Sequence, residues 1–505
     1  MKIRTSFRFL LVSRALLAGS VLSAAPPPAF DVTFTVNTVA DTPDATPGDW
    51  QCADAQGKCS LRAAIDEHDR LPQQTQCAIG ATSRQITCTV KKVIKLPSGT
   101  YNLTGGELKI TASMVILGAG SDTTFIDAGQ NSRIFELVNV SQTGWEPTVN
   151  ILDVTIRNGQ APTSTDPGGG ILIRVGSALY LTNCVVSGNK STIYGAGIAN
   201  AGYLSAGSCT IRDNRITGLT TGAGFTATGG GIHNYFTQPG NYGTPVVKLN
   251  SCTISVNQGT RGGGICNVGT LEIENSTISG NRVFAGGGGI DNFGVATIAF
   301  STITENVANL GAPQENPDWT TGGGILNFET VRMSATILAN NIDNRTNSDA
   351  RYSPDCYSRT DVGNAIFQSE GGNLEGIINQ NWNLNVAGGD QAGTPNNPLD
   401  PRLLPLHSNG GLTMTHALRT DSPALDHARG SGFFVACPRV DQRGQWRPVG
   451  PACDVGAFEL FRFYKWPWPW PWPPVLAVLI VSTLALAISM LLFSRARRMA
   501  TTESK

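Results

Sequence analysis

One motif returns many times along the chain, and this repeat constrains the fold more than any other feature. Residues 262–281 read GGGICNVGTLEIENSTISGN, with a glycine-rich opener and a closer that ends on asparagine. The openers have the form GGGI or GAGI, and their isoleucines are Ile171, Ile198, Ile232, Ile265, Ile290 and Ile325. Successive isoleucines are 27, 34, 33, 25 and 35 residues apart. A period of about 25 residues with insertions indicates a solenoid.

Each repeat has the pattern of short β-strands. Leu271 and Ile273 alternate with polar residues, β-branched residues dominate, and glycine and asparagine separate the segments. We predict three strands per repeat, namely Gly-Gly-Ile-x-Asn, Leu-x-Ile and Ser-Thr-Ile-Ser. Because one repeat cannot bury its own apolar face, equivalent strands must stack in parallel. The sequence therefore predicts an all-β protein, a right-handed parallel β-helix over residues 91–345, with stacked asparagines at its corners.

The two ends of such a solenoid expose unpaired strand edges and need covers. Residues 31–90 are expected to form an N-terminal cap with a helix over 60–71 and Ser60 as its N-cap. One face of this helix carries Leu61, Ala64, Ile65 and His68. Residues 346–460 leave the repeat and are rich in proline and glycine. We expect them to form an irregular C-terminal module that lies along the side of the solenoid.

Both ends of the chain carry targeting signals. Residues 1–25 combine a basic start, an apolar run and small residues, the order of a secretory signal peptide; an uncleaved N-terminal anchor is the alternative. Residues 475–493 form a run of 19 residues without a charge, long enough to cross a membrane as a single helix. The arginines in the tail, 494–505, place this tail in the cytoplasm and the β-helix on the extracytoplasmic side.

A spacer over residues 461–474 connects the module to the predicted membrane helix. It contains WPWPWPWPP, in which alternating prolines predict a stiff, extended stalk and tryptophan favours the headgroup zone of a membrane. Two interpretations of the tail stay open: a plain single-span anchor, and a sorting tail that is cut and replaced by another anchor. In both, the protein is exported and held at the cell envelope or surface.

The composition narrows the partners and the compartment. Lys+Arg and Asp+Glu balance at 37 each, so we expect no nucleic-acid partner. Eleven cysteines fit an oxidising compartment. Three pairs are close enough in sequence to close small disulfide loops: Cys52 and Cys59, Cys77 and Cys88, and Cys437 and Cys453. Cys184, Cys209 and Cys252 occupy an inward position, either as buried thiols or as bridges between coils. No cofactor is predicted, and we expect a monomer.

Segments on both sides of the repeat resemble a known protein family. CADAQGKCSLRAAIDEHDRL, followed by IKLPSGTYNLT, resembles the start of exported bacterial β-helix proteins with a Cys-Ser-Leu-Arg-Glu-Ala-type signature. DPRLLPLHSNGGLTMTHALRTDSPALDHA, with DQRG and CDVGAFE, is similar to their C-terminal choice-of-anchor Q domain. The resemblance implies a pectate-lyase-like fold and surface display, but no particular activity. Ala63 replaces an acidic residue of the signature, and Cys356 lacks the second cysteine that often follows in such modules.

One column of outward residues has the composition of a reactive site. Ile and Asn of each Ile-x-Asn strand share a face, so the middle residue points outward. On three consecutive coils this residue is His233, Cys266 and then Asp291. A cysteine beside a histidine suggests an activated thiolate with Asp291 as a further polar partner, or a three-ligand metal site. These three residues are weak catalytic candidates.

Aromatic residues follow at the next outward position of the same face. They are Tyr235, Phe293 and Phe328, and two insertions add Tyr242 and Trp319. Because outward aromatic rings stack on sugars, these five residues are candidate ligand-binding residues. Two alternatives remain: residues 355–460 cover this face, or the insertions are surface loops without function.

Common polysaccharide-degrading chemistries require residues that the chain lacks. β-Helix hydrolases use clustered aspartates and lyases use Ca²⁺ with an Arg or Lys base, whereas residues 168–345 hold few acids and the chain has no Asp-Asp pair. We predict an adhesin-like, non-catalytic surface protein that binds glycans or other cell-surface partners. The alternatives are a polysaccharide lyase or glycoside hydrolase on a pectate-lyase-like scaffold, and a purely structural envelope spacer.

Overall fold

The computed structural model describes residues 29–72, 74–79, 84–140, 146–218, 228–236, 243–310, 322–345, 352–359, 365–378, 384–385, 389–428 and 436–461. The chain divides into two compact units, Met1–Leu460 and Phe461–Lys505, and the description concerns the first. The predicted signal peptide and the predicted membrane helix lie outside the described residues. Within the described part, no helix is long and apolar enough to cross a membrane.

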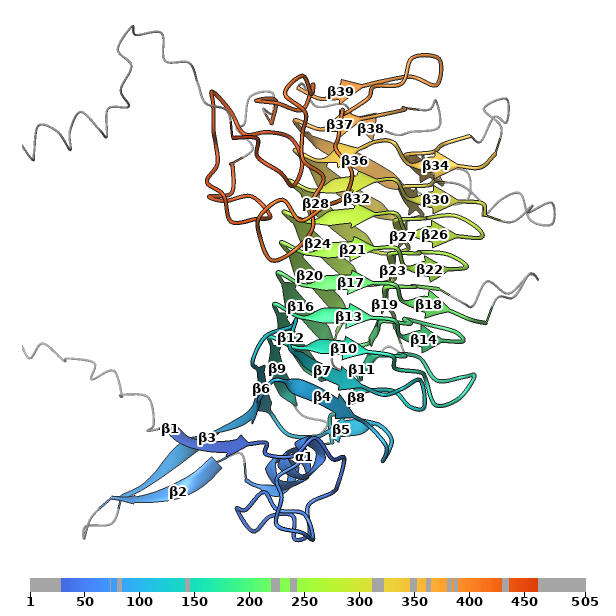
Figure 1. Cartoon of the computed structure of the whole chain (residues 1–505). Coiled ribbons are helices and arrows are strands. Elements are labelled where there is room, and N and C mark those ends of the chain that lie inside the picture. Colours follow the sequence, from blue (N-terminus) through green and yellow to red (C-terminus); the bar gives the residue numbers. More distant parts are fainter. Residues whose placement is uncertain are drawn as a thin grey trace, which may run out of the picture. The chain divides into compact units, whose positions relative to one another are not determined.

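Strands of consecutive coils stack in parallel into sheets, named A to D below (Figure 1). Sheet A contains β1 (Ala29–Thr35), β3 (Arg84–Leu96), β6 (Met114–Gly118), β9 (Thr148–Leu152), β12 (Ala178–Thr182), β16 (Tyr203–Gly207), β20 (Val246–Asn250), β24 (Thr270–Glu274), β28 (Val295–Ala299), β32 (Thr330–Ser334), β36 (Ile366–Gly371) and β38 (Leu384–Asn385). The strand β2 (Gln74–Ile79) pairs with β3 in the antiparallel sense.

The other three sheets have shorter strands. Sheet B contains β4 (Gly99–Asn102), β7 (Thr124–Asp127), β10 (Thr155–Arg157), β13 (Val185–Ser187), β17 (Thr210–Arg212), β21 (Thr253–Ser255), β25 (Thr277–Ser279), β29 (Thr302–Thr304), β33 (Ile337–Leu338), β37 (Leu374–Glu375) and β39 (Gln391–Ala392). Sheet C contains β5 (Leu108–Ile110), β8 (Phe135–Leu137), β11 (Ile171–Ile173), β15 (Ile198–Asn200), β19 (Ile232–Asn234), β23 (Ile265–Asn267), β27 (Ile290–Asn292), β31 (Ile325–Asn327) and β35 (Cys356–Ser358). Sheet D contains β14 (Lys190–Ser191), β18 (Arg215–Ile216), β22 (Gln258–Gly259), β26 (Arg282–Val283), β30 (Val307–Ala308) and β34 (Ile342–Asp343).

The parallel β-helix predicted from the repeat is confirmed. From β12 to β35 each coil visits sheets A, B, D and C in turn, and equivalent residues of adjacent coils pair in register. The aliphatic residues of the repeat, such as Leu271, Ile273 and Ile278, point inward and are at most 2% exposed. They join one continuous core that runs through the stack. This burial is the main stabilising term that a single repeat would lack.

Two asparagine ladders line the inside of the corners. The first ladder consists of Asn189, Asn214, Asn257, Asn281, Asn306 and Asn341. Each side-chain Nδ2 donates to the Oδ1 of the next asparagine at 2.9–3.0 Å, and Asn341 donates to Asp355 at 2.9 Å. The second ladder consists of Asn200, Asn234, Asn267, Asn292 and Asn327, with spacings of 2.8–2.9 Å. These bonds satisfy buried amides that would otherwise destabilise the core.

The helix predicted near the N-terminus is present. The helix α1 (Leu61–Arg70) begins after Ser60, whose Oγ accepts a hydrogen bond from the Ala63 amide at 2.9 Å. Leu61, Ala64 and Ile65 join the core and cover its first coils. A disulfide between Cys52 and Cys59 closes the preceding loop, as expected. The side chains of the candidate pair Cys77 and Cys88 lie outside the described part.

The C-terminal module lies along the solenoid and contacts sheet B. Gln442 Nε2 donates to Thr253 Oγ1 at 2.9 Å, and Thr277 Oγ1 donates to Gln442 Oε1 at 2.6 Å. His416 Nε2 lies 2.8 Å from Ser279 Oγ. Figure 1 shows this orange-red segment on the side of the stack away from sheet D. The expected Cys437–Cys453 disulfide is present.

Two features of the coils differ from the prediction. The six coils from β12 to β35 each have a fourth strand, in sheet D, which the sequence does not reveal because two residues are too few to show an alternation. The stacking also begins before residue 91 and continues past residue 345, to β39. The repeat pattern misses the last coils because Cys356 and Glu375 occupy the core positions of Ile325 and Leu338. Burial raises the pKa of Glu375 to about 8, so this carboxyl is protonated near neutral pH.

Candidate binding faces

The predicted column of His233, Cys266 and Asp291 is present on sheet C. His233 of β19 pairs with Cys266 of β23, and Cys266 pairs with Asp291 of β27. Ala199 precedes this column and Leu326 follows it. The alternation of the Ile-x-Asn strand therefore predicts the direction of these side chains correctly.

The column is nevertheless buried. His233, Cys266 and Asp291 are 5%, 1% and 0% exposed. Three side chains from the segments just before the glycine-rich openers fold over them: Tyr194, Thr228 and Arg261. Parallel bridges join Tyr194 to Thr228 and Thr228 to Arg261, so the covering residues form a column of their own.

Glycine at the start of each opener permits this close approach. Gly229 and Gly262 have φ of +71° and +56°. A Cβ at Gly229 would lie 2.7 Å from the His233 Cβ, and a Cβ at Gly262 would lie 2.8 Å from the Cys266 Cβ. Only glycine fits both the left-handed backbone and the short distance. The glycines of the repeat thus bring the covering segment directly onto the column.

The contacts of the column are those of a packed interior. Thr228 Oγ1 lies 2.6 Å from His233 Nδ1, and the Tyr194 ring centroid is 4.7 Å from that of His233. Arg261 Nε lies 2.9 Å from Asp291 Oδ2, and Arg261 Nη2 donates to Asp291 Oδ1 at 3.0 Å. His233 and Asp291 therefore each have a local role in packing or charge pairing.

Electrostatics also oppose a reactive thiolate. Burial raises the pKa of the Cys266 thiol well above its ordinary value, and the Asp291 carboxylate raises it further. Burial lowers the pKa of His233 to about 4, so the imidazole is neutral at physiological pH. Burial raises the pKa of Asp291 to about 6, although Arg261 acts in the opposite direction. A catalytic cysteine requires a lowered pKa and access to substrate, and Cys266 has neither.

Partly exposed aromatic residues surround the covered column. We call Tyr194, Tyr235, Phe293 and Phe328 the aromatic strip, and all four are half-buried. The Phe293 and Phe328 rings stack with centroids 4.4 Å apart and planes 11° apart. The Tyr194 and Tyr235 rings lie 6.2 Å apart in a stacked arrangement. Tyr242 and Trp319, the other two candidates, lie outside the described residues.

The buried cation Arg261 supports the strip from beneath. Its guanidinium carbon lies 4.8 Å from the centroid of Phe293 and 5.0 Å from that of Phe328. Because Arg261 is also paired with Asp291, one side chain fixes both rings and the column. The Phe293 and Phe328 rings thus pack on a buried ion pair.

Residues 355–460, the alternative cover of this face, have most of their described contacts with the solenoid elsewhere, although one of them reaches the strip. The module contacts sheet B through Gln442 and His416, whereas β35 extends sheet C by one more strand. Arg359, just after β35, places its guanidinium carbon 5.8 Å from the Phe328 ring. The polar outer positions of sheet B, such as Thr253 and Thr277, give the module its hydrogen-bond partners.

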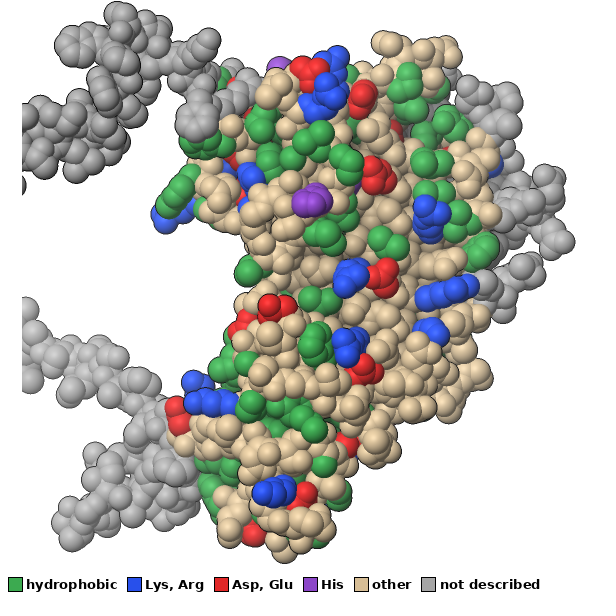
Figure 2. Space-filling model, in the orientation of Figure 1, with side chains coloured by type: hydrophobic (Ala, Val, Ile, Leu, Met, Phe, Trp, Pro, Cys, Tyr) green, Lys and Arg blue, Asp and Glu red, His purple; other side chains and the backbone are tan. Residues whose placement is uncertain are grey.

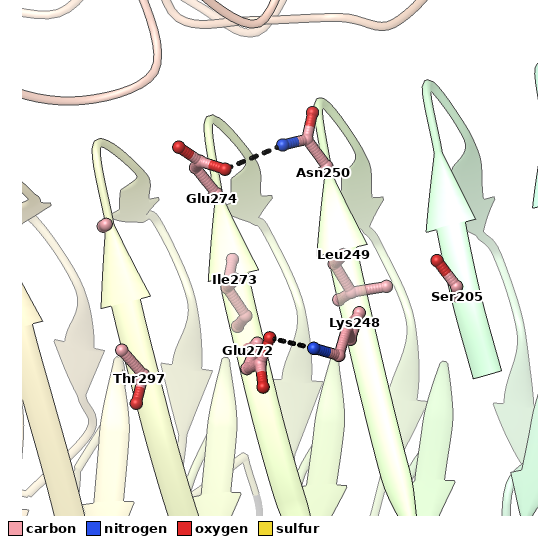
Figure 3. A pocket seen from close by; sticks show the side chains of 9 residues that line it. Ser205, Lys248, Leu249, Asn250, Glu272, Ile273, Glu274 and Thr297 are labelled. Atoms are coloured by element: carbon pink, nitrogen blue, oxygen red, sulfur yellow. Dashed lines mark hydrogen bonds and ion pairs between the residues drawn. The ribbon is translucent and has the colours of Figure 1, made fainter. Parts of the chain in front are cut away.

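A second feature, a hollow on the outer face of sheet A, was not predicted from the sequence. Its volume is about 530 Å³, and it is lined by Ser205, Lys248, Leu249, Asn250, Glu272, Ile273, Glu274, Thr297 and Ala299. Figure 3 shows Lys248 against Glu272, and Asn250 against Glu274, on neighbouring strands. The Lys248 Nζ–Glu272 Oε2 distance is 2.7 Å, and Asn250 Nδ2 donates to Glu274 Oε2 at 3.0 Å. In the sequence, this hollow could have been expected only from small residues, such as Ser205 and Thr297, that share a register position with the larger Lys248 and Glu272.

Cation-binding chemistry finds little support in the described part of the chain. No group of three His, Cys, Asp or Glu side chains there is arranged to hold a metal ion. The free cysteines in the same residues, namely Cys184, Cys209, Cys252, Cys266 and Cys356, are all buried. On the face seen in Figure 2, acidic and basic side chains are interspersed. Such a surface has no strong field of one sign that would attract a polyelectrolyte.

Comparisons with known proteins give the fold little further context. No family model matches the chain, so the resemblance to choice-of-anchor Q proteins stays a prediction. No curated protein matches it either. Among solved structures the chain is similar to the crystal structure of pectate lyase Pel9A, with a TM-score of 0.41 and 13% identity over 85% of this chain and 96% of that one. This likeness is too distant to bear on activity, and the parallel β-helix is established by the strand pairing itself.

Proposed function

We propose that this chain is an exported, membrane-tethered β-helix protein that binds glycans through the aromatic strip of sheet C without catalysing their cleavage. The observation that carries the proposal is the stacked pair Phe293 and Phe328, half-exposed and held by the buried Arg261. Rigid, partly exposed rings give contact area at low entropic cost. The ring faces of sugars are suitable partners for such a platform.

The burial of the neighbouring reactive groups supports binding rather than catalysis. His233 and Cys266 are covered and uncharged near neutral pH, so neither acts as a base or a nucleophile on a bound sugar. Asp291 is committed to Arg261. A glycoside hydrolase acting at the strip would instead need two accessible carboxyl groups beside it, at a defined separation.

A glycan array with the full-length protein tests this proposal. We expect binding to a subset of glycans, and a loss of about tenfold or more in the Phe293→Ala/Phe328→Ala variant. The matched control is Trp446→Ala, which removes an aromatic ring that is 72% exposed on the C-terminal module. Equal binding by the two variants, or no glycan bound by the wild type, refutes the proposal.

The tether is a separate part of the proposal and has its own support. The uncharged run 475–493, the arginines after it and the tryptophan–proline spacer favour a single span with the β-helix outside the cytoplasm. Two disulfides are consistent with an oxidising compartment. Fractionation of cells that express the full chain, or a chain ending at residue 460, tests it. We expect the first in the membrane fraction and the second in the soluble exported fraction; membrane retention of the shortened chain contradicts the tether.

A further inference from the structure

We propose that the hollow on sheet A is a second binding site and that it accepts a neutral oligosaccharide. The inference is independent of the function proposed for sheet C, because the two sites share no residue and lie on different sheets.

The lining of the hollow combines short and long side chains on neighbouring strands. Ser205, Lys248, Glu272 and Thr297 occupy the same register position on four consecutive strands of sheet A. Ser205 and Thr297 are short, whereas Lys248 and Glu272 between them are long. At about 530 Å³, the hollow falls in the usual range for sites that bind small ligands. Adjacent strands are about 4.8 Å apart, so a ligand lying along this column would contact several coils at once.

The polar groups of the hollow match sugar hydroxyls in both hydrogen-bond senses. The side chains of Lys248 and Glu272 are 43% and 47% exposed, so their ion pair still faces solvent. In Figure 3, Asn250 and Glu274 form a second pair at the ends of the same strands. The ammonium and the amide donate, whereas the two carboxylates accept. A sugar hydroxyl both donates and accepts hydrogen bonds, so a donor next to an acceptor, as in each of these two pairs, can bind it.

An aromatic rim lies beside these polar groups. Tyr203 is on the same strand as Ser205, and its ring centroid is 5.5 Å from that of Tyr180 on the preceding coil. Tyr180 is 38% exposed. Tyr180 pairs in register with Ser205, one of the lining residues, so its ring lies on the strand next to the hollow. Ring stacking at one end and hydroxyl recognition in the middle are the two elements of a sugar subsite.

The charges of the hollow disfavour an acidic ligand. Its lining carries one cation, Lys248, and two carboxylates, Glu272 and Glu274. Lys248 is already neutralised by Glu272 at 2.7 Å. Uronate groups within this lining would therefore meet two carboxylates, an unfavourable arrangement, whereas the exposed cation Arg332 follows Thr297 one strand further along the column. A neutral oligosaccharide avoids this repulsion.

The same ion pair opposes cleavage of the ligand. The hydrogen bond from Lys248 to Glu272 raises the pKa of the lysine. A lysine that acts as a general base needs its pKa lowered towards neutrality, so Lys248 is poorly suited to proton abstraction. This observation disfavours Lys248 as the base of a lyase reaction in the hollow.

Isothermal titration calorimetry with the full-length protein tests the inference. The neutral probes are the hexasaccharides of a β-1,4-glucan and a β-1,4-mannan, and the acidic probe is hexagalacturonate. We expect at least one neutral probe to bind, and the Lys248→Ala/Glu272→Ala variant to bind it about tenfold or more weakly. Phe293→Ala/Phe328→Ala, on sheet C, should leave this affinity unchanged, which separates this inference from the function proposed above.

A second variant tests the charge argument. Glu272→Gln/Glu274→Gln removes both carboxylates and leaves Lys248 unpaired, so it should gain measurable binding of hexagalacturonate, which the wild type should not bind. The inference is overturned if neither neutral probe binds, or if the wild type binds hexagalacturonate as tightly as it binds a neutral probe. It is also overturned if Lys248→Ala/Glu272→Ala leaves the affinity for the neutral probe unchanged. Unchanged melting temperatures of the variants show that folding is intact.

Discussion

The outer faces of sheets A and C carry polar side chains at the same place in their strands, yet only one of them is open. On sheet A, Lys248 and Glu272 are nearly half-exposed. On sheet C, Cys266 and Asp291 are almost completely buried. The difference arises from the connections, since the segments before the sheet C strands fold Thr228 and Arg261 onto the column. Alternation along a strand thus determines the direction of a side chain, whereas the adjoining loops determine its access to solvent.

The largest expected contrast is between the two ion pairs. Arg261→Ala leaves the Asp291 carboxylate buried without its cation and should destabilise the fold by about 3–5 kcal/mol. Chemical denaturation followed by circular dichroism measures this loss. Replacing both partners, as Arg261→Met/Asp291→Leu, should recover most of it. A loss below about 1 kcal/mol for Arg261→Ala would mean that the column is as open as sheet A.

Thiol labelling compares the same strand position on the two sheets. Cys266 is 1% exposed, and burial raises the pKa of its thiol. We expect native Cys266 to react with iodoacetamide on the order of a hundredfold more slowly than a cysteine introduced by Ser205→Cys in the hollow. Mass spectrometry of peptides after timed labelling gives both rates. Similar rates at the two positions would remove the distinction between the faces.

A pH effect should be specific to sheet C. The pKa of His233 is about 4 in the fold against an ordinary value of 6.5, so the unfolded chain binds a proton that the folded chain excludes. Protonation of the unfolded chain therefore lowers the free energy of unfolding by about 2–3 kcal/mol as the pH falls from 6.5 towards 4, whereas above pH 6.5 His233 is neutral in both states and stability is not reduced.

His233→Gln should therefore lose less stability than the wild type between pH 7 and pH 4.5. Asp291 opposes the effect with its raised pKa, but equally in both proteins, so the difference between them isolates His233. Melting temperatures at the two pH values provide the measurement. Parallel shifts in the two proteins would show that His233 is accessible to protons while folded.

The smallest effect is expected on sheet A. Lys248→Ala/Glu272→Ala removes an exposed ion pair and should change the unfolding free energy by less than about 1 kcal/mol, with no dependence on salt beyond that of the wild type. Denaturation at low and high salt concentrations tests this. A loss as large as that of Arg261→Ala would place the pair in a desolvated site and weaken the case for an open hollow.

The sequence predicts the architecture well because the repeat encodes it directly. Ile265, Leu271 and Ile278 report the inward face of each strand, and the closing asparagines report the corners. The helix cap is equally readable, since Ser60 and the apolar face of α1 follow local rules. Two-residue strands and the irregular last coils, with Glu375 in a core position, leave no periodic signal and are therefore missed.

The candidate site is less predictable because exposure depends on contacts between coils. The stacking of His233, Cys266 and Asp291 follows from the repeat. Their burial depends on Thr228 and Arg261, which stand before glycines and belong to no strand of sheet C. The hollow on sheet A likewise depends on small residues in adjacent coils, a relation that appears only once the register is fixed.

The first asparagine ladder, which runs from Asn189 to Asn341, has one direction of hydrogen bonding and ends at a carboxyl group. Each side-chain amide donates a hydrogen bond to the next asparagine towards the C-terminus, and Asp355 accepts the last of these bonds, from Asn341. Its carboxylate also accepts from the Asn341 and Ile377 amides, and it has no amine to offer to another coil. Evolution or engineering can therefore lengthen or shorten this rod by whole turns upstream of Asp355, whereas a turn added beyond it would find nothing to continue the chain of amides.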